Sequence, residues 1–587
     1  MGFLKQVLAT ITGILLSTVL LFIGLVFLIG VFVQMSSEDT VTVAPTNSVL
    51  YISLDYNVTD KTESNPLEDI SIPFYGSEKS IGLNDILARI ESAKKDDNIK
   101  GIYLNVSTAN LGFASLQAIR TALLDFKTTK KFIVSYSDTY SQKAYYLSSV
   151  ADKIYLNPEG SLDFRGLSSS VMFMKEALDK IGVEMQVIKV GTYKSAVEPF
   201  ILNSMSPANR EQVSSFINSI NGTVLGDISV DRKITVDSLR AIADNYLIRN
   251  VDDALKYKFI DAKLYKDELL TDIKKRLGIK ENDDISSVSI LKYNGQPKTE
   301  SSSDEVAVLY AYGNIVDGEG ASGEIGGDGI SRELRKLRLN DKVKAVVLRV
   351  NSGGGSALAS DIIWREVELT KKVKPIMVSM GDYAASGGYY IAAAADSIFA
   401  EETTLTGSIG VFGMIPDFQN LLNNKIGVHF DQVNTGKFSG MMASLDKPLT
   451  AEERSIIQVQ VNSTYQTFME RVAKGRNMSV AEVDSIGQGR VWTGKQALTL
   501  GLVDKMGDTH SAIKAAASKA KLKDYKVAEY PSKETGFWAV LSGSKDQIKM
   551  WFLEDELGDY HRYLMDAKKV LKQSGIQARL PYSIEIY

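Results

Sequence analysis

A serine stands among small residues at a predicted strand-to-helix turn, in the segment Ala384-Ala385-Ser386-Gly387-Gly388. A serine in such a turn is unhindered, and it lies close to the N-terminus of the helix that follows. A Gly-Gly pair before a helix is more commonly a packing feature, so the turn alone does not establish catalysis. The segment makes Ser386 a candidate nucleophile that requires a base and an oxyanion site.

Three consecutive glycines follow another predicted strand, in the segment Asn351-Ser352-Gly353-Gly354-Gly355-Ser356. Glycines let backbone N–H groups approach a ligand closely, which suits an anion or an oxyanion. The same run could bind a phosphate. However, the G-x-x-x-x-G-K-[ST] pattern of phosphate-binding loops does not follow it. The segment therefore favours an oxyanion site.

The candidate base is a lysine, because imidazole is scarce in this chain. The 587 residues contain three histidines and no cysteine. A lysine can take the proton of a serine if burial keeps its amine neutral. Lys194 stands in Gly191-Thr192-Tyr193-Lys194-Ser195-Ala196, and Ser408 in Thr406-Gly407-Ser408-Ile409-Gly410 could hold its amine by a hydrogen bond. A turn serine bonded to its own backbone explains Ser408 equally well.

The composition excludes several other classes of site. Without cysteine the chain has no disulfides, thiol nucleophiles, zinc ribbons or iron–sulfur clusters. Three histidines argue against a histidine-rich metal centre. The formal net charge of −4 argues against a nucleic-acid binder, which usually has a basic domain. We expect no metal and no cofactor.

The chain contains an internal repeat, and its two halves differ at the candidate residues. The segment VSYSDTYSQKAYYLSSVADKIY from Val134 matches VSMGDYAASGGYYIAAAADSIF from Val378. At this spacing the counterpart of Ser386 is Gln142, and residues 109–111 replace the three glycines. A second pair of matching segments gives Lys194 the counterpart Ser439. One half therefore kept the serine and the other kept the lysine.

Strand-like and helix-like segments alternate in both halves. In the second half the run Lys342–Val350 is strand-like, residues 359–370 have helical spacing, and Pro375–Met380 is strand-like again. This alternation is typical of βαβ units with a mostly parallel sheet covered on both faces. We predict an α/β fold made of two tandem repeats.

An apolar run near the N-terminus predicts a membrane anchor. No charged residue lies between Gln6 and Ser37, and residues 9–33 are almost wholly apolar. About 20 apolar residues span a bilayer, and this run is longer than the apolar part of a cleaved signal peptide. Lys5 precedes the run, so the positive-inside rule places the body of the chain outside the cytoplasm.

The segments RVNSGGGS, SMGDYAASGGYYIAAAAD, TGSIGVFG and GTYKSAVEPF resemble the signature segments of the signal peptide peptidase A family, also called protease IV, in its long duplicated form. The resemblance extends from about residue 47 to residue 530 and includes the anchor. It departs from the family at one position, since Gly353 stands where the family usually has proline. Glycine loosens that turn but keeps its backbone donors.

The resemblance implies a serine endopeptidase that degrades released signal peptides and needs no cofactor. It implies a crotonase-like (caseinolytic-protease-like) fold in each repeat, a homotetramer, and a single-pass location in the inner (cell) membrane with the body on the periplasmic or outer face. Carried over by motif, Ser386 is the nucleophile, Lys194 the general base and Ser408 the residue that orients the lysine. The expected backbone oxyanion donors are Gly354, Gly355 and Gly387.

Two alternatives stay open at this point. A crotonase-type acyl-CoA enzyme would share the fold and the glycine cradle, but it would use carboxylates and need no anchor. A catalytically silent membrane scaffold would have lost Ser386 or Lys194, and both are present.

We expect five segments along the chain. They are the N-terminal end with the membrane helix and stalk (1–46), the first repeat with the lysine (47–295), a linker (296–305), the second repeat with the serine (306–535), and a C-terminal tail with helical spacing around Trp551–Val570 (536–587).

Overall fold

The protein was analysed as a computed structural model. It describes residues 43–62, 80–295, 302–441, 446–531, 576–580 and 586, together with short runs and single positions between residues 2 and 24. The predicted membrane helix (residues 9–33) falls largely outside these residues, and the helix expected over Trp551–Val570 lies outside them entirely. Within the described part of the chain, no helix has both the length and the apolar character that a bilayer crossing requires.

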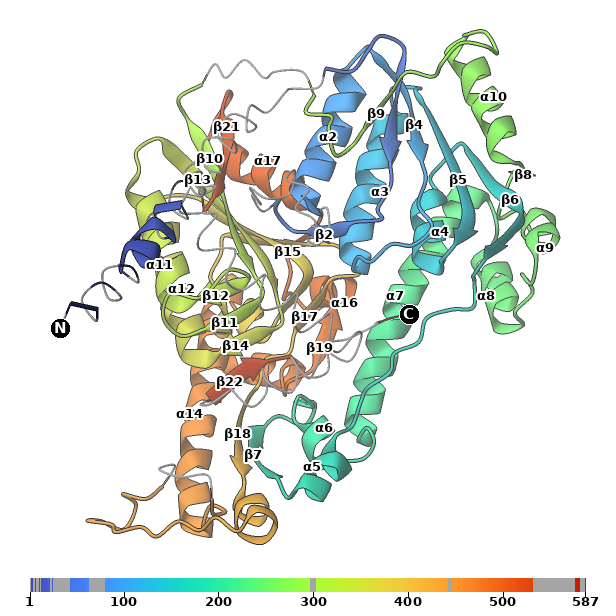
Figure 1. Ribbon diagram of the computed structural model, residues 1–587. Helices are drawn as coiled ribbons and strands as arrows, with labels where there is room; N and C mark the ends of the chain where they lie inside the picture. Colours follow the sequence, from blue (N-terminus) through green and yellow to red (C-terminus); the bar gives the residue numbers. More distant parts are fainter. Residues whose placement is uncertain are drawn as a thin grey trace.

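The first half forms a six-stranded parallel sheet (Figure 1). Its central strands are buried along most of their length because both faces of the sheet are covered. Helices α2 (Leu83–Lys95) and α3 (Phe113–Lys127) pack on one face, and α10 (Lys266–Leu277) packs on the other. In spatial order the strands are β8 (Ala262–Lys263), β6 (Lys153–Leu162), β5 (Phe132–Tyr140), β4 (Ile99–Leu104), β1 (Ser48–Ile52) and β9 (Ser287–Ser289).

The second half repeats this layout in an eight-stranded sheet. Helices α11 (Gly327–Leu339) and α12 (Ala357–Lys371) pack on one face, and α17 (Thr509–Lys519) packs on the other. The main path is β19 (Val491–Thr493), β17 (Leu405–Gly407), β15 (Ile376–Ala385), β13 (Val343–Ser352), β10 (Glu305–Tyr312) and β21 (Lys526–Tyr530). Off this path, β16 (Ser397–Ala400) pairs with β15, and β20 (Lys505–Met506) pairs with β16. The predicted α/β class and the two repeats are confirmed.

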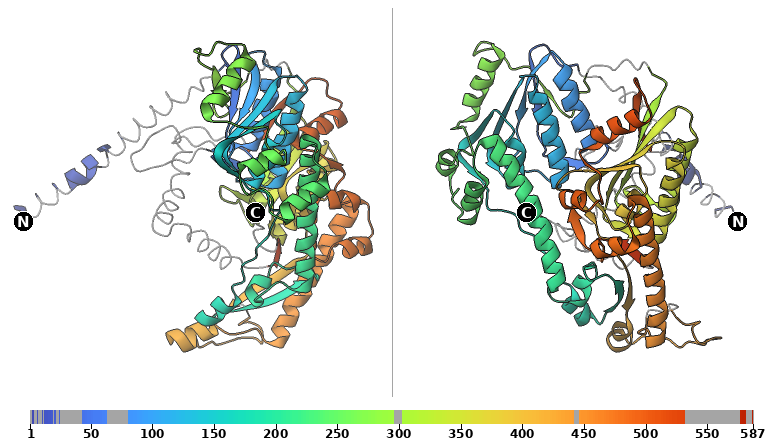
Figure 2. Two further views of the ribbon diagram at one scale, coloured as in Figure 1. Left: turned by 90° about the vertical axis from the view of Figure 1, so that its right-hand side faces the viewer. Right: turned by 180° about the vertical axis from the view of Figure 1, so that it is seen from behind.

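A third sheet joins the two halves, and it is the element that positions the candidate site. It contains one strand of the first half, four of the second and one from the C-terminal tail. In spatial order these are β12 (Glu324–Gly326), β11 (Asn314–Val316), β14 (Gly354–Ser356), β22 (Ile576–Arg579), β18 (Val411–Asp417) and β7 (Glu184–Val190). Strands β7 and β18 pair antiparallel over seven residues and form an arm that projects from the body (Figure 2).

Two 26-residue helices, α7 (Pro207–Arg232) and α14 (Ala451–Arg476), run from the arm along the two bodies (Figure 1). The remaining elements are short. They are β2 (Asn57–Thr59), β3 (Ser80–Gly82), α4 (Gln142–Ser148), α5 (Lys175–Ile181), α6 (Glu198–Ile201), α8 (Val236–Asp244), α9 (Val251–Lys256), α13 (Gly387–Ala392), the π-helix Asn420–Ile426, α15 (Val480–Ile486) and α16 (Gly494–Thr499).

A buried ion pair fixes the two repeats against each other near the glycine segment. The Arg349 guanidinium, on β13, lies 2.9 Å from the Asp60 carboxylate of the first repeat. The same carboxylate accepts a hydrogen bond from the side chain of Asn351, two residues further along the strand. Because both partners of the ion pair are almost fully buried, removing either would leave an uncompensated charge, so the pair locks the relative placement of the repeats.

Candidate active site

Ser386 lies at the turn between strand β15 and helix α13, as the small residues around it predict. Its backbone has φ 55° and ψ −114°, a conformation that is strained for any residue with a side chain. Its amide donates a hydrogen bond of 2.8 Å to the Gly407 carbonyl, which holds the turn against β17. The side chain is fully buried, and its hydroxyl donates a long hydrogen bond of 3.4 Å to the Gly410 carbonyl.

The loop that carries Lys194 reaches this turn because β7 pairs with β18. The register places Val190, the last residue of β7, opposite Val411, so the loop that follows β7 continues beside Ser408 and Gly410. The amine of Lys194 lies 2.7 Å from the hydroxyl oxygen of Ser386. Two residues separated by 192 positions, one from each repeat, are therefore in direct hydrogen-bond contact.

Burial changes the protonation of this lysine. The Lys194 side chain is fully buried, and loss of water contact lowers the pKa of its amine well below the ordinary 10.5. The direction follows from desolvation, which disfavours the charged form of an amine. A neutral amine has a lone pair, so the group beside Ser386 can act as a base.

Ser408 supplies two further oxygens to the same amine. Its hydroxyl oxygen lies 3.1 Å and its carbonyl oxygen 3.2 Å from the Lys194 nitrogen. Ser408 has a positive φ of 50°, and its own amide donates a hydrogen bond of 2.7 Å to the Arg490 carbonyl. The two contacts fix the direction of the amine, so that its third close oxygen is the Ser386 hydroxyl.

Two of the three expected oxyanion glycines, Gly354 and Gly387, lie together beside the serine. Gly354 and Gly355 form strand β14, and Gly387 is the first residue of α13. A Cβ added to Gly354, whose φ is +97°, would lie 2.6 Å from the amide nitrogen of Gly387. Only glycine permits this approach of the two backbones. The Gly354 amide donates a hydrogen bond of 3.1 Å to the Ser352 hydroxyl.

Gly489 is a residue that the sequence analysis missed. A Cβ at this position would lie 2.6–2.7 Å from the backbone and Cβ of Lys194, and the glycine has a positive φ of 78°. Its neighbour Gln488 accepts a hydrogen bond of 2.8 Å from the Tyr193 amide through its backbone carbonyl. The loop around Gly489 in the second repeat thus packs tightly against the loop of the first repeat that carries Lys194. A lone loop glycine carries no sequence signal for such a contact.

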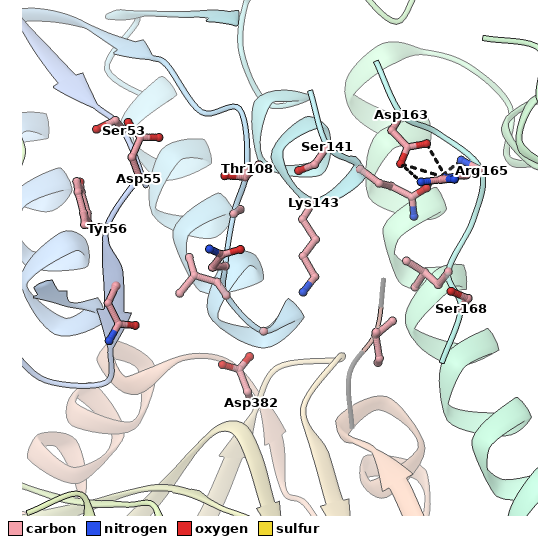
Figure 3. A pocket seen from close by; sticks show the side chains of 18 of the residues that line it. Ser53, Asp55, Tyr56, Thr108, Ser141, Lys143, Asp163, Arg165, Ser168 and Asp382 are labelled. Atoms are coloured by element: carbon pink, nitrogen blue, oxygen red, sulfur yellow. Dashed lines mark hydrogen bonds and ion pairs between the residues drawn. The ribbon is translucent and has the colours of Figure 1, made fainter. Parts of the chain in front are cut away.

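The corresponding region of the first repeat is an open pocket with a volume of about 1530 Å³ (Figure 3). Gln142, the counterpart of Ser386, lines it, and so do Ala109, Asn110 and Leu111, the counterparts of the three glycines. The side-chain oxygen of Gln142 accepts hydrogen bonds from two backbone amides, those of Arg165 and Gly166. Gln142 therefore has a structural role here. We call this cavity the Gln142 pocket.

A carboxylate of the second repeat closes one side of the Gln142 pocket. Asp382 accepts hydrogen bonds of 3.0 Å from the amide and 2.6 Å from the hydroxyl of Ser115, in the first turn of α3. It reaches the pocket opposite the wall that carries Ser141 and Lys143 (Figure 3). In the second repeat the matching helix, α12, is capped by its own Ser356, which accepts from the Ala359 amide. Burial raises the pKa of Asp382.

The model of peptidase family S49 matches residues 125–280 and again residues 368–523. The chain belongs to peptidase family S49. One match falls on each repeat. Lys194 lies within the first match and Ser386 within the second.

Relatives match over nearly the whole chain. "Protease 4" of Salmonella typhi is 35% identical over 98% of this chain and 95% of its own length. "Protease 4" of Haemophilus influenzae is 34% identical over 97% and 92%. "Serine protease SPPA, chloroplastic" of Arabidopsis thaliana is 32% identical over 84% and 73%. This S49 chain is a serine peptidase.

Proposed function

We propose that the chain is a membrane-anchored endopeptidase that degrades released signal peptides with a serine–lysine dyad. The observation that carries the proposal is the 2.7 Å contact between the Lys194 amine and the Ser386 hydroxyl, with both groups buried. A base must lie within about 2.6–3.2 Å of the proton that it removes. The charge state that burial favours at Lys194 is the one that a base requires.

In the proposed reaction, the neutral amine of Lys194 accepts the proton of the Ser386 hydroxyl as its oxygen attacks a peptide carbonyl. Ser408 keeps the amine directed at that hydroxyl in both protonation states, because its two oxygens accept from the amine or from the ammonium. The ammonium then gives its proton to the leaving amine. In the second half of the cycle Lys194 takes a proton from the water that attacks the acyl-serine, and it returns this proton to the Ser386 oxygen when the acyl–oxygen bond breaks.

Backbone amides next to the serine would stabilise the oxyanion of each tetrahedral intermediate. Gly387 follows Ser386 directly, and Gly354 approaches it so closely that no side chain fits between them. Preorganised donors of this kind contribute about 10²–10³ in rate each. Their positions are set by β14 and α13, and the Gly354 amide would exchange its present hydrogen bond to the Ser352 hydroxyl for one to the oxyanion.

Substitution of the nucleophile tests the proposal. Ser386→Ala should abolish cleavage of an apolar signal-peptide sequence, followed by mass spectrometry, while the far-UV circular dichroism stays unchanged. Ser439→Ala is the matched control, because this serine of the same repeat lies in an exposed loop. Cleavage by Ser386→Ala at the wild-type rate would contradict the proposal.

The location in the inner membrane and the homotetramer are part of the same proposal. The apolar run at residues 9–33 and the family resemblance support them. A chain lacking residues 1–45 should hydrolyse short soluble peptides normally but lose activity on peptides bound to vesicles, because an anchor raises the effective concentration of membrane substrates. Equal activity of both forms on vesicles would remove this role. Analytical ultracentrifugation of the full chain in detergent tests the tetramer.

A further inference from the structure

The C-terminal strand β22 lies along the catalytic glycines in the manner of an extended peptide. It pairs antiparallel with β14, with Gly354 opposite Arg579 and Gly355 opposite Ala578. The Leu580 amide donates a hydrogen bond of 2.6 Å to the Gly353 carbonyl, which extends the ladder by one residue. Main-chain pairing of this kind is a general way of binding extended peptides at a strand edge.

The carbonyl of Ala578 points at the oxyanion glycines. A Cβ added to Gly354 would lie 2.1 Å from the Ala578 oxygen, and one added to Gly387 would lie 3.0 Å from the same atom. The oxygen thus lies against two of the three glycines that are expected to bind the oxyanion. While residues 576–580 occupy this position, a second peptide cannot pair with β14.

The side chains of this segment are seated in both repeats. Ala578 is fully buried in the core of the second repeat, and Leu580 is buried in that of the first. Burial of an aliphatic side chain is favourable, so the buried Leu580 anchors the segment. The segment is therefore held by side chains as well as by its backbone.

The end of the same tail reaches the Gln142 pocket. Ile586 lines this pocket, packs against the core of the first repeat and forms an antiparallel bridge with Ser169. The hydroxyl of Ser169 is a buried group without a hydrogen-bond partner among the described residues. The pocket thus has polar walls and an apolar contact for Ile586, with an isolated backbone bridge beside it, and these features suit a short extended peptide.

We propose that the Gln142 pocket is a non-catalytic peptide-binding site whose occupant is the C-terminal end of this chain, held there while residues 576–580 close the catalytic glycines. The pocket descends from a peptide-binding active site by duplication, and with Gln142 in place of the serine it binds without cutting. Two anchor points on one short segment make the second contact intramolecular, with an effective concentration in the millimolar range. Loss of the pocket contact should therefore release the strand.

Hydrogen exchange of the full chain tests this binding without any need for catalysis. All proteins carry Ser386→Ala, so that no peptide is cut. Ile586→Asp puts a charge into the apolar seat, and Ser168→Trp fills the pocket from an exposed position of its wall. Each should speed exchange of the Ala578 and Leu580 amides at least tenfold. Ser214→Trp, an exposed serine of α7, is the matched control and should change nothing.

Unchanged exchange of residues 576–580 in both Ile586→Asp and Ser168→Trp would overturn the proposal. That result would also follow if the pocket bound the downstream end of substrates instead of the tail. In that case Ser168→Trp, measured in a chain that keeps Ser386, would raise KM for long peptides and leave KM for short peptides unchanged.

Activity supplies the second readout, and only this part rests on the proposed function. In the Ser386 background, Ile586→Asp and Ser168→Trp should raise the rate on a short soluble peptide several-fold, because the glycine strand becomes free. Faster exchange with unchanged hydrolysis would contradict closure by the tail. If the wild-type chain and all variants were inactive, the proposed function would fail, and the exchange result would still decide whether the pocket holds the tail.

Discussion

The two equivalent turns of this molecule, one in each repeat, begin their helices in different ways. In the first repeat, Ser141 precedes α4 with ordinary backbone angles, and its side chain accepts a capping hydrogen bond from the Ala144 amide. In the second repeat, Ser386 precedes α13 with a positive φ and makes no such cap. Strain of this kind costs about 1–3 kcal/mol. The fold therefore does not require the strained turn, and its presence in one repeat points to chemistry.

The two matching loops that carry Lys194 and Ser439 also differ, in how deeply they are buried. The lysine loop of the first repeat is buried, and Gly489 clasps it from the other repeat. The matching loop of the second repeat, around Ser439, is exposed. Asp382 reaches into the Gln142 pocket instead. The buried serine and lysine thus come from different repeats, and the Gln142 pocket has a glutamine at the position of the serine.

The largest expected effect concerns the base. Lys194→Arg should lower kcat about 10²–10⁴-fold, because a guanidinium stays protonated and cannot accept the serine proton. Lys437→Arg is the control, since Lys437 belongs to the matching exposed loop and pairs with Glu452. Steady-state hydrolysis of a soluble peptide measures both. Wild-type kcat in Lys194→Arg would show that the base lies elsewhere.

The pH dependence sharpens the same comparison. Burial lowers the pKa of Lys194, and below that pKa the amine carries a proton and cannot act as a base. The rate should therefore fall about tenfold for each pH unit below the lowered pKa and reach a plateau above it. The plateau should begin well below pH 10.5. A rate that still rose steeply at pH 10.5 would mean that the lysine is not desolvated.

A smaller effect, on the free energy of unfolding, is expected when the caps of helices α3 and α12 are removed. Asp382→Ala removes the cap of α3 that comes from the other repeat, and Ser356→Ala removes the local cap of α12. Each loss should lower the free energy of unfolding by about 0.5–2 kcal/mol, with Asp382→Ala at the upper end because it also deprives the Ser115 hydroxyl of its acceptor. Urea unfolding measures both. An unchanged midpoint for Asp382→Ala would show that its contact contributes nothing.

The last substitution, at the counterpart of Ser386 in the first repeat, should not change activity. Gln142→Ser introduced into Ser386→Ala should not restore hydrolysis, because the counterpart of the lysine is Ser439 and the three glycines are replaced by residues 109–111. A sensitive fluorogenic peptide assay is the measurement. Any recovered turnover would mean that the first repeat retains a base of its own.

The sequence predicted the repeats and the candidate residues for a physical reason. Alternation of strands and helices follows from local periodicity, and the divergence of two otherwise matching halves marked Ser386 and Lys194. Their roles stay predictions, although the structure places the two side chains in contact. The pairing of β7 with β18 could not be predicted, because it joins segments more than 200 positions apart with no shared pattern.

The same limit applies to Asp382 and to the C-terminal strand. A cap supplied from another repeat leaves no local signature, since Gly112 before α3 is an ordinary loop residue in the sequence. The tail was expected to be helical around Trp551–Val570, which lies outside the described residues, and residues 576–579 form strand β22. The strand is set by its partners at β14 and β18, which sequence periodicity does not encode.

Covalent labelling tests most directly whether a serine of one repeat is activated by a lysine of the other. A serine-reactive fluorophosphonate should label the full chain, and peptide mapping should place the adduct on Ser386. Ser386→Ala should show no adduct. Lys194→Met should be labelled at least a hundredfold more slowly, because the Ser386 hydroxyl then has no base beside it. Labelling of Lys194→Met at the wild-type rate, or an adduct on another serine, would contradict the account.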